Sequence, residues 1–364
     1  MPLYDTDSSS TNTALLMVLG THRSGTSLTT HILSLLGGHV SEKLVGAKQS
    51  NIGGHFEDAE IIEITKAIEL KIRRPHFNVL GILPISGKDL TSNRFDAEKK
   101  ALEEILIRNI SAGPPPWIMK DPRSQRLLPL WNELLDKNNI STQIVTCLRN
   151  PEAAIRSRSA RNNLPENMSQ LIWLTEMAEL VVNTNGNLGI VIEFESLIQD
   201  PVSTLSAVKH RLPAPLQHDS KDLMSRLSGI VSRDQVHFST SEKSLLWPDT
   251  REFYQVIVES SLGQADDRMT QARRRMLQIA RGHLEKLEVL SGFLGDQEWL
   301  TDRLIFTDRQ LVRERQKLEQ TTKKLQNYKT ATVRKLMQLE GISSLSADVL
   351  SKSSKAADFY RSLI

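Results

Sequence analysis

The chain has 364 residues, and its 46 Lys and Arg residues nearly balance 43 Asp and Glu residues, so the formal net charge is only +3. This balance excludes a polycation that coats nucleic acid or an anionic membrane, and any positively charged site must be local. The length is sufficient for one large domain with an appendage or for two domains. The single cysteine, Cys147, excludes an intrachain disulfide and a zinc site built from cysteines, and its apolar neighbours predict a buried core residue.

The first 13 residues are polar and acidic, and we expect residues 1–13 to form a flexible N-terminus. A secretory signal would carry positive charge at this point. The longest apolar run, residues 14–19, is far shorter than the roughly 20 residues that a helix needs to span a bilayer. We therefore expect a cytoplasmic protein without stable insertion into a membrane.

Four short apolar runs are predicted as buried strands, and each is followed by a loop and then by a helical pattern. This alternation is typical of a parallel sheet with helices on both faces. One helix is predicted at residues 28–36, before a Gly-Gly pair, and another begins at Pro151, because proline is tolerated in the first helical turn. The strands are predicted at residues 14–19, 117–119, 143–148 and 190–194.

The first strand is followed by Gly-Thr-His-Arg-Ser-Gly-Thr-Ser, residues 20–27, called the glycine loop below. Its spacing is that of a phosphate-binding loop, G-x-x-x-x-G-K-[ST], in which backbone N–H groups and a helix N-terminus surround an anion. Thr26 stands where a nucleoside triphosphatase has its lysine, so that charge is missing. Arg23 provides a forked cation that suits a diphosphate-like ligand, and the hydroxyls of Ser24, Thr26 and Ser27 add further polar groups.

Two later strand ends also carry cations, at the edge where parallel sheets bind ligands. Lys120, Asp121 and Arg123 follow the second strand, and an acid flanked by two cations favours a site without a metal ion. Arg149 ends the third strand, and Ser157 lies eight residues further on, about two helical turns, so the two side chains can converge on one phosphate. The glycine loop alone could be a structural turn, the Lys-Asp-Arg group a solvated ion-pair loop, and the arginines after Arg149 an exposed basic face. Three cationic loops at successive strand ends nevertheless predict an anion-binding site.

The sequence changes character near residue 248, where strand patterns end and Arg, Gln, Glu and Lys become abundant. We expect a domain over residues 14–247, a helical extension over 248–340 and a tail over 341–364. The extension has a coiled-coil spacing, with one leucine in every seven residues, but the companion positions are polar. A long amphipathic helix that packs on its own domain, on a partner enzyme or on a second copy fits equally well. The repeated leucines are Leu304, Leu311, Leu318 and Leu325.

Together these motifs resemble the sulfotransferases that use 3′-phosphoadenosine-5′-phosphosulfate (PAPS). HRSGTS is similar to the 5′-phosphosulfate loop of this family, and LRNPEAAIRS is similar to its 3′-phosphate motif, in which a serine follows an arginine by eight residues. GHFEDAEI, KDPR and IEFESLIQDP resemble accompanying blocks of bacterial and Golgi-type members, although Phe194 stands where tyrosine is common. The resemblance covers roughly residues 15–212.

The resemblance implies an α/β fold, a P-loop-like parallel sheet flanked by helices, here with a C-terminal helical extension. It also implies PAPS as the donor, 3′,5′-adenosine diphosphate as the product, and no metal ion. A sulfuryl group carries less negative charge than a γ-phosphoryl group, so positioning and cationic donors can stabilise its transfer. The residues implied in donor binding are Arg23, Ser24, Gly25, Thr26, Ser27, Arg149 and Ser157.

The resemblance further implies that Lys120 offsets charge on the bridging oxygen of the donor and that Arg23 also acts in catalysis. The acceptor must lose a proton to a base that faces the donor. Glu57 is the predicted base, because Golgi-type relatives use a glutamate in the segment after the first helix, and Asp58 and His55 are the alternatives. Glu57 could also be a helix-capping or solvated acid.

The predicted reaction is metal-independent, in-line transfer of a sulfuryl group to an acceptor hydroxyl. A carbohydrate, such as a bacterial cell-surface glycan or glycolipid, is the leading acceptor, and a small metabolite is the alternative. Two other functions are open: a nucleotide kinase or NTPase with a degenerate P-loop, and a non-catalytic scaffold that acts through the C-terminal helix. Preference for ATP·Mg²⁺ over 3′,5′-adenosine diphosphate would indicate the first of them.

Overall fold

A computed structural model describes residues 13–46, 54–72, 82–217, 227, 230–231, 246–262 and 267–339. The chain divides into two compact units, Met1–Ser291 and Gly292–Ile364, and each is described by itself. Residues 1–12 of the predicted N-terminal segment and the whole predicted tail, 341–364, lie outside the described residues.

The first unit is built on a four-stranded parallel sheet with the strand order β2-β1-β3-β4. In register, Leu15 of β1 lies opposite Trp117 of β2 and Thr142 of β3. The structure confirms all four predicted strands to within one residue at either end, except that Phe194, predicted as a strand residue, begins a helix. The strands are β1 (Leu15–Leu19), β2 (Trp117–Lys120), β3 (Thr142–Leu148) and β4 (Ile190–Glu193).

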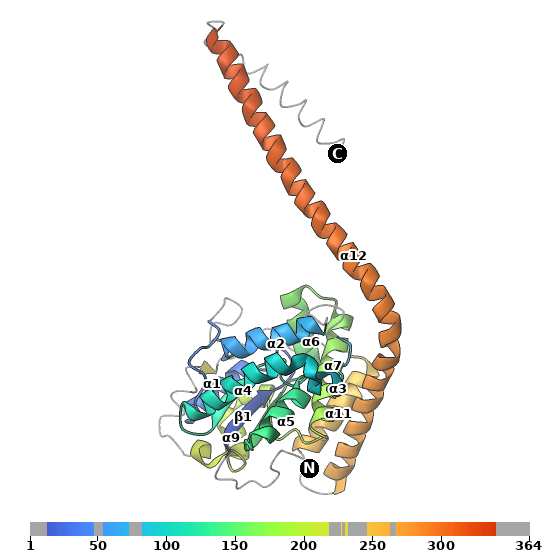
Figure 1. Cartoon of the computed structure of the whole chain (residues 1–364). Coiled ribbons are helices and arrows are strands. Elements are labelled where there is room, and N and C mark those ends of the chain that lie inside the picture. The colour runs from blue at the N-terminus through green and yellow to red at the C-terminus, as the bar shows by residue number, and fades with distance from the viewer. Residues whose placement is uncertain are drawn as a thin grey trace. The chain divides into compact units, whose positions relative to one another are not determined.

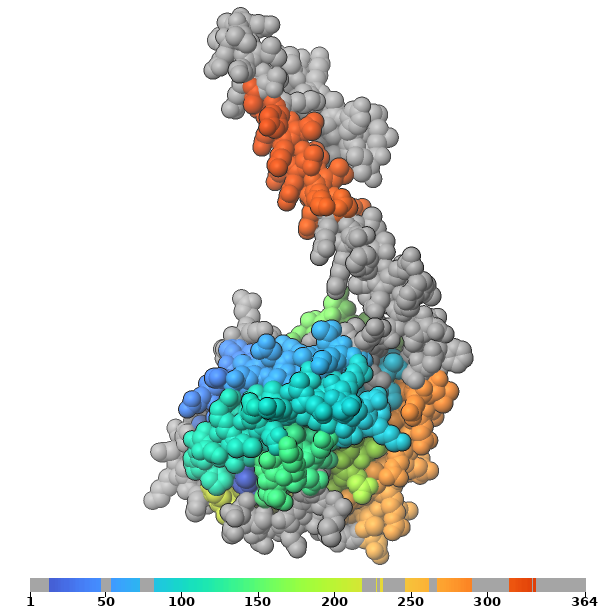
Figure 2. Space-filling view, in the orientation of Figure 1, coloured from blue at the N-terminus to red at the C-terminus, as the bar shows by residue number. Residues whose placement is uncertain are grey.

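Helices cover both faces of the sheet, as Figure 1 shows. Side chains alternate along β1, so Leu15, Met17 and Leu19 pack into one core while Leu16 and Val18 pack into another. The first core contains residues of α2, α4, α5, α6 and α7, and the second contains residues of α1, α8 and α9. In the space-filling view, α2, α4 and α5 form a continuous outer layer that hides most of the sheet (Figure 2). The predicted α/β fold, a parallel sheet flanked by helices, is confirmed.

The helices of the first unit follow the predicted alternation. The helix predicted at 28–36 is α1, and the helix predicted from Pro151 is α6. Their bounds are α1 (Thr26–Leu35), α2 (Ala59–Lys71), α3 (Gly87–Thr91), α4 (Asp96–Ser111), α5 (Leu128–Lys137), α6 (Pro151–Asn162), α7 (Glu166–Asn183), α8 (Phe194–Gln199), α9 (Pro201–Lys209) and α11 (Pro248–Leu262), with 3-10 turns at Asn93–Phe95 and Ala214–Gln217.

Helices also follow residue 248, where α11 is succeeded by α12 (Asp267–Leu339). Phe253 of α11 and Met276 of α12 are almost completely buried in the first core, so α11 and the start of α12 belong to the first unit, which extends to Ser291. The predicted division into a domain over residues 14–247 and a helical extension over residues 248–340 stays a prediction. None of the described helices combines the length and apolar character that a membrane span requires.

In the second unit, the leucine repeat can be followed at two of its four positions. Leu318 is 57% exposed and Leu325 is 60% exposed, so these side chains are available to a partner of apolar character. Leu304 and Leu311 lie outside the residues whose side chains are described. The coiled coil, and with it assembly through the C-terminal helix, stays a prediction.

The start of the glycine loop depends on a close approach between two backbones. Gly20 has φ 145°, and a Cβ atom there would lie 2.5 Å from the carbonyl oxygen of Cys147. We expect Gly20→Ala to lower the free energy of unfolding by about 3 kcal/mol, measured by chemical denaturation, because strain and overpacking add. Gly87→Ala is the control, since its Cβ would meet Pro129 at an ordinary 3.5 Å. Equal stability of the two variants would contradict this expectation.

Candidate active site

The glycine loop joins β1 to α1 through a left-handed turn. Gly25 has φ 83° and ψ 13° at the N-cap of α1, and a Cβ atom there would lie 2.3 Å from the ring of Phe194. Arg23 has φ 72°, which is uncommon for a residue with a side chain. The turn is held by a hydrogen bond of 2.7 Å between the hydroxyls of Thr21 and Ser24. The loop therefore has a defined shape that places its N–H groups at the start of α1.

Two predicted arginines and a predicted serine meet beside this loop. Arg23 Nε donates to Ser157 Oγ at 2.9 Å, and Arg149 Nη1 donates to the backbone oxygen of Arg23 at 2.8 Å. The Arg149 guanidinium lies 4.5 Å from the centre of the Phe194 ring, a cation–π contact. The structure thus brings together Arg23 of the glycine loop, Arg149, which directly follows β3, and Ser157 of α6.

The charge around Arg23 is strongly positive. Burial lowers the pKa of Arg23 to about 10, and repulsion by Arg161, Arg149 and Arg158 contributes to the shift. Arg149 Nε lies 3.7 Å from Oε1 of Glu195, whose side chain is 42% exposed. This excess of cations, with a hydroxyl and a helix N-terminus close by, is suited to a multiply charged anion.

Lys120 forms a second charged set at the other end of the glycine loop. Its ammonium group donates to Ser27 Oγ at 3.4 Å and to the backbone oxygen of His55 at 3.2 Å, and it forms a short ion pair with Glu57. Burial lowers the pKa of Lys120, although the Glu57 and Asp121 carboxylates oppose the shift. The structure therefore places Lys120 and Glu57 together, next to a loop residue.

The other carboxylate considered as a base, Asp58, has a structural task. Its side chain caps α2 by accepting from Glu60 N at 2.9 Å and Ile61 N at 3.1 Å, and Asn109 Nδ2 donates to it at 3.1 Å. The capping role that the sequence left open for Glu57 thus falls to its neighbour. Glu57 keeps a side-chain exposure of 13%, which leaves it access to solvent.

Asp121 and Arg123 form a buried ion pair, where the sequence alone allowed a solvated one. Asp121 accepts from Thr65 Oγ1 at 2.8 Å and from Arg123 Nη1 at 2.8 Å, and Arg123 Nε lies 3.3 Å from Glu69 Oε2. Both residues of the pair are less than 9% exposed. Within the described ranges, no three His, Cys, Asp or Glu side chains are grouped as metal ligands would be.

Glu69 makes folding stability depend on pH. Burial raises the pKa of Glu69 to about 7 from an ordinary value of 4.5, despite the nearby Arg123. The protonated carboxyl group of Glu69 makes its full contribution to the free energy of unfolding below about pH 4.5. This contribution is lost as the pH rises through 7 and the group becomes charged. We expect the parent protein to lose about 2 kcal/mol more stability than Glu69→Gln between about pH 5 and pH 8 in denaturant titrations. Parallel pH profiles of the two proteins would contradict this.

Glu176 of α7 was not predicted, yet it links the glycine loop to α6. Its carboxylate accepts from Arg158 Nη2 at 2.6 Å and from the backbone N of His22 at 3.3 Å, and it contacts His22 Nδ1 at 3.2 Å. Burial would raise the pKa of Glu176, but Arg158 and His22 hold it well below its ordinary value. In the sequence it is one polar residue of an amphipathic helix, and no local motif distinguishes it.

No family model matches the chain, and no curated protein matches it. Among solved structures, the chain is similar to the sulfotransferase domain from the Synechococcus PCC 7002 olefin synthase, with 17% sequence identity and a TM-score of 0.34. The similarity covers 75% of this chain and 97% of that chain. Values this low assign neither a family nor an activity.

Proposed function

We propose that the protein is a PAPS-dependent sulfotransferase that transfers a sulfuryl group to an acceptor hydroxyl. One observation carries the proposal: the glycine loop contacts two charged sets through its own residues. Arg23 bonds to Ser157 and contacts Arg149, while Ser27 lies beside the Lys120–Glu57 pair. The first set suits the anionic groups of a nucleotide, and the second suits proton and charge transfer at a reacting oxygen.

The residues around the loop fit a donor of this type. Burial lowers the pKa of Arg23, and repulsion by Arg161, Arg149 and Arg158 adds to the shift, so the site favours the binding of an anion. Arg149 and Ser157 would hold the 3′-phosphate. The 5′-phosphosulfate would lie against the loop residues Arg23, Ser24, Gly25, Thr26 and Ser27. When bound, PAPS supplies a sulfuryl group on a good leaving group.

The Lys120–Glu57 pair supports the chemistry of the transfer. A Glu57 carboxylate oxygen accepts the proton of the acceptor hydroxyl, as a general base must. The Lys120 ammonium, held beside Ser27, offsets the negative charge that develops on the leaving oxygen. Because Lys120 is buried, this charge acts in a site of low polarity, where it is worth more than in water.

We further propose a carbohydrate hydroxyl as the acceptor, with a small metabolite as the alternative.

Binding of the nucleotide and transfer of the sulfuryl group are tested separately. Calorimetry compares 3′,5′-adenosine diphosphate with ATP·Mg²⁺, and preference for ATP·Mg²⁺ would replace the proposal by a nucleotide kinase or NTPase. Incubation with ³⁵S-labelled PAPS and neutral oligosaccharides, acidic polysaccharides, glycolipids, peptides and small alcohols then follows the label. Tight binding of 3′,5′-adenosine diphosphate, with label on a peptide instead of a glycan, would overturn only the carbohydrate acceptor.

A further inference from the structure

Two contacts, one behind the other, join the glycine loop to α6. In the first, Arg23 Nε donates to Ser157 Oγ at 2.9 Å. In the second, the residue before Arg23 and the residue after Ser157 bind the same carboxylate of α7. Glu176 accepts from the backbone N of His22 at 3.3 Å and from Arg158 Nη2 at 2.6 Å. The junction of the loop with α6 is thus bridged both directly and through Glu176.

Backbone strain and charge repulsion both act against the direct contact. Arg23 has φ 72°, a left-handed conformation that costs free energy for a residue with a side chain. Burial lowers the pKa of Arg23 to about 10, and repulsion by Arg158 is one of the further causes of this shift. Glu176 opposes both effects, because its buried carboxylate neutralises Arg158 and holds the backbone one residue before the strained position.

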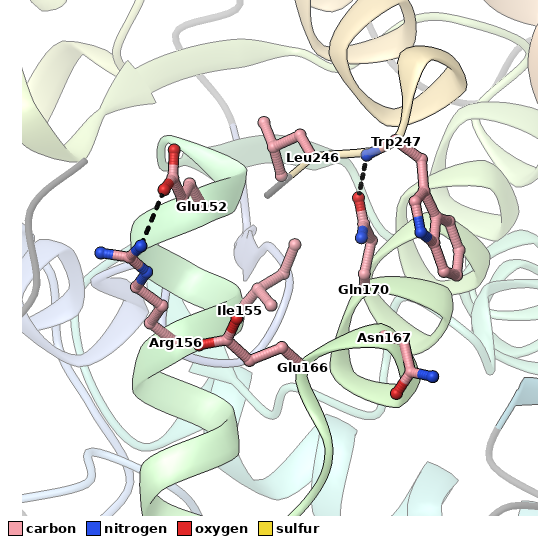
Figure 3. A pocket seen from close by; sticks show the side chains of 8 residues that line it. All are labelled: Glu152, Ile155, Arg156, Glu166, Asn167, Gln170, Leu246 and Trp247. Atoms are coloured by element: carbon pink, nitrogen blue, oxygen red, sulfur yellow. Dashed lines mark hydrogen bonds and ion pairs between the residues drawn. The ribbon is translucent and has the colours of Figure 1, made fainter. Parts of the chain in front are cut away.

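The space between α6 and α7 is not completely filled by side chains. A cavity of about 200 Å³ is lined from α6 by Ile155 and from α7 by Gln170 (Figure 3). Protein interiors normally leave few voids larger than a water molecule, so apolar packing does not by itself fix the position of α6 here. Polar bridges between the two helices therefore help to fix it. One joins the hydroxyls of Ser159 and Ser169 at 2.7 Å, and the other is the contact of α6 with Glu176.

We propose that Glu176 is a positioning residue, which sets Arg23 and Ser157 in the geometry that binds the anionic groups of the nucleotide. This role rests on the proposed function, and Glu176 acts in it through His22 and Arg158. Charge and geometry predict opposite effects at this position. The negative charge of Glu176 repels an anionic ligand, so removal of the charge alone would strengthen binding, whereas loss of the bridge would weaken it.

The test is the affinity for 3′,5′-adenosine diphosphate, measured by calorimetry on two variants of the full chain. Glu176→Gln has the shape of the parent side chain but only one acceptor oxygen, and its amide NH₂ group would face the backbone N of His22 or the guanidinium of Arg158. At least one bridge is then lost. Glu176→Asp keeps the charge, but its side chain is too short to reach both partners. We expect each variant to bind the nucleotide at least about tenfold more weakly than the parent.

The matched control is Glu179→Gln, about one helical turn later on α7. Glu179 is also almost completely buried and pairs with an arginine, Arg126, but it accepts in addition from the backbone N of Ile85, in the segment before α3. This variant should lose stability in thermal unfolding, as Glu176→Gln does, yet bind the nucleotide within about twofold of the parent. Amide hydrogen exchange of residues 20–25 without ligand should be faster in both Glu176 variants and unchanged in the control.

The outcomes separate the positioning role from the proposed function. Binding by either folded Glu176 variant that equals or exceeds that of the parent would overturn the positioning role alone, and so would unchanged hydrogen exchange in the loop. Failure of the folded parent to bind 3′,5′-adenosine diphosphate would overturn the proposed function and the positioning role with it. If Glu176→Gln does not fold, Glu176→Asp decides, because it leaves Arg158 with a countercharge.

Discussion

Replacing Lys120 with methionine is expected to lower kcat for sulfuryl transfer by about 10²- to 10³-fold, with nearly unchanged affinity for 3′,5′-adenosine diphosphate. The Lys120 ammonium contacts Ser27 and Glu57 beside the loop, whereas the arginine cluster contacts Arg23. A cation in this position stabilises charge that develops during transfer and contributes little to binding of the product nucleotide. Transfer of label from ³⁵S-PAPS gives the rate, and calorimetry gives the affinity.

This variant also leaves Glu57 without its cation, and loss of one partner of a buried pair destabilises the fold. The double variant Lys120→Met/Glu57→Gln removes both charges and should recover stability while remaining inactive. Lys99→Met is the matched control, because Lys99 is buried and its ammonium lies 2.9 Å from Glu133 in a pair between α4 and α5. It should lose stability and keep its transfer rate. Transfer at the parent rate by the double variant would refute the role of Lys120.

Arg149→Ala is expected to weaken binding of 3′,5′-adenosine diphosphate by about 10²-fold or more. The change removes a cation of the proposed phosphate site, and it also removes the hydrogen bond that Arg149 donates to the backbone of Arg23. Without that bond, the left-handed turn at Arg23 loses a constraint. Calorimetry at several salt concentrations measures the affinity and the part of it that is due to charge, because the affinity of the parent should fall with salt more steeply than that of the variant.

Two further variants separate charge from geometry at this position. Arg149→Lys keeps the charge and loses the planar fork, so its affinity should lie between those of the parent and Arg149→Ala. Arg275→Ala removes an exposed arginine that lies 2.6 Å from Glu252, and it should bind the nucleotide within about twofold of the parent. Binding by Arg149→Ala as tight as that of Arg275→Ala would show that Arg149 is no ligand.

The strands were predictable because buried parallel strands consist of short apolar runs bounded by loops. All five side chains of β1 are at most 1% exposed, and its predicted bounds differ by one residue from those observed. The strand order could not be read in the same way, since it depends on which crossover helix packs on which face. Phe194 shows a related limit: the apolar run continues through it, but the chain turns into α8 so that its ring can lie under Gly25.

The meeting of Arg23, Arg149 and Ser157 was predictable from spacing, because the carboxyl ends of adjacent parallel strands share one edge of the sheet. Their roles in binding stay predictions. The task of Asp58 required the backbone, because only the direction of the chain into α2 shows which acid reaches the first helical N–H groups. Glu176 lies more than one hundred residues from the loop it holds, so no local pattern could reveal it.

The central position of β1 in the sheet has a consequence for the order in which the strands can pair during synthesis. The ribosome makes β1 and the glycine loop first, but both neighbours of β1 come much later, at Trp117–Lys120 and Thr142–Leu148. At ordinary translation rates, β1 waits on the order of ten seconds for a pairing strand. During that time the apolar side chains of β1 have no sheet to enter, so they stay exposed until the neighbouring strands have been made.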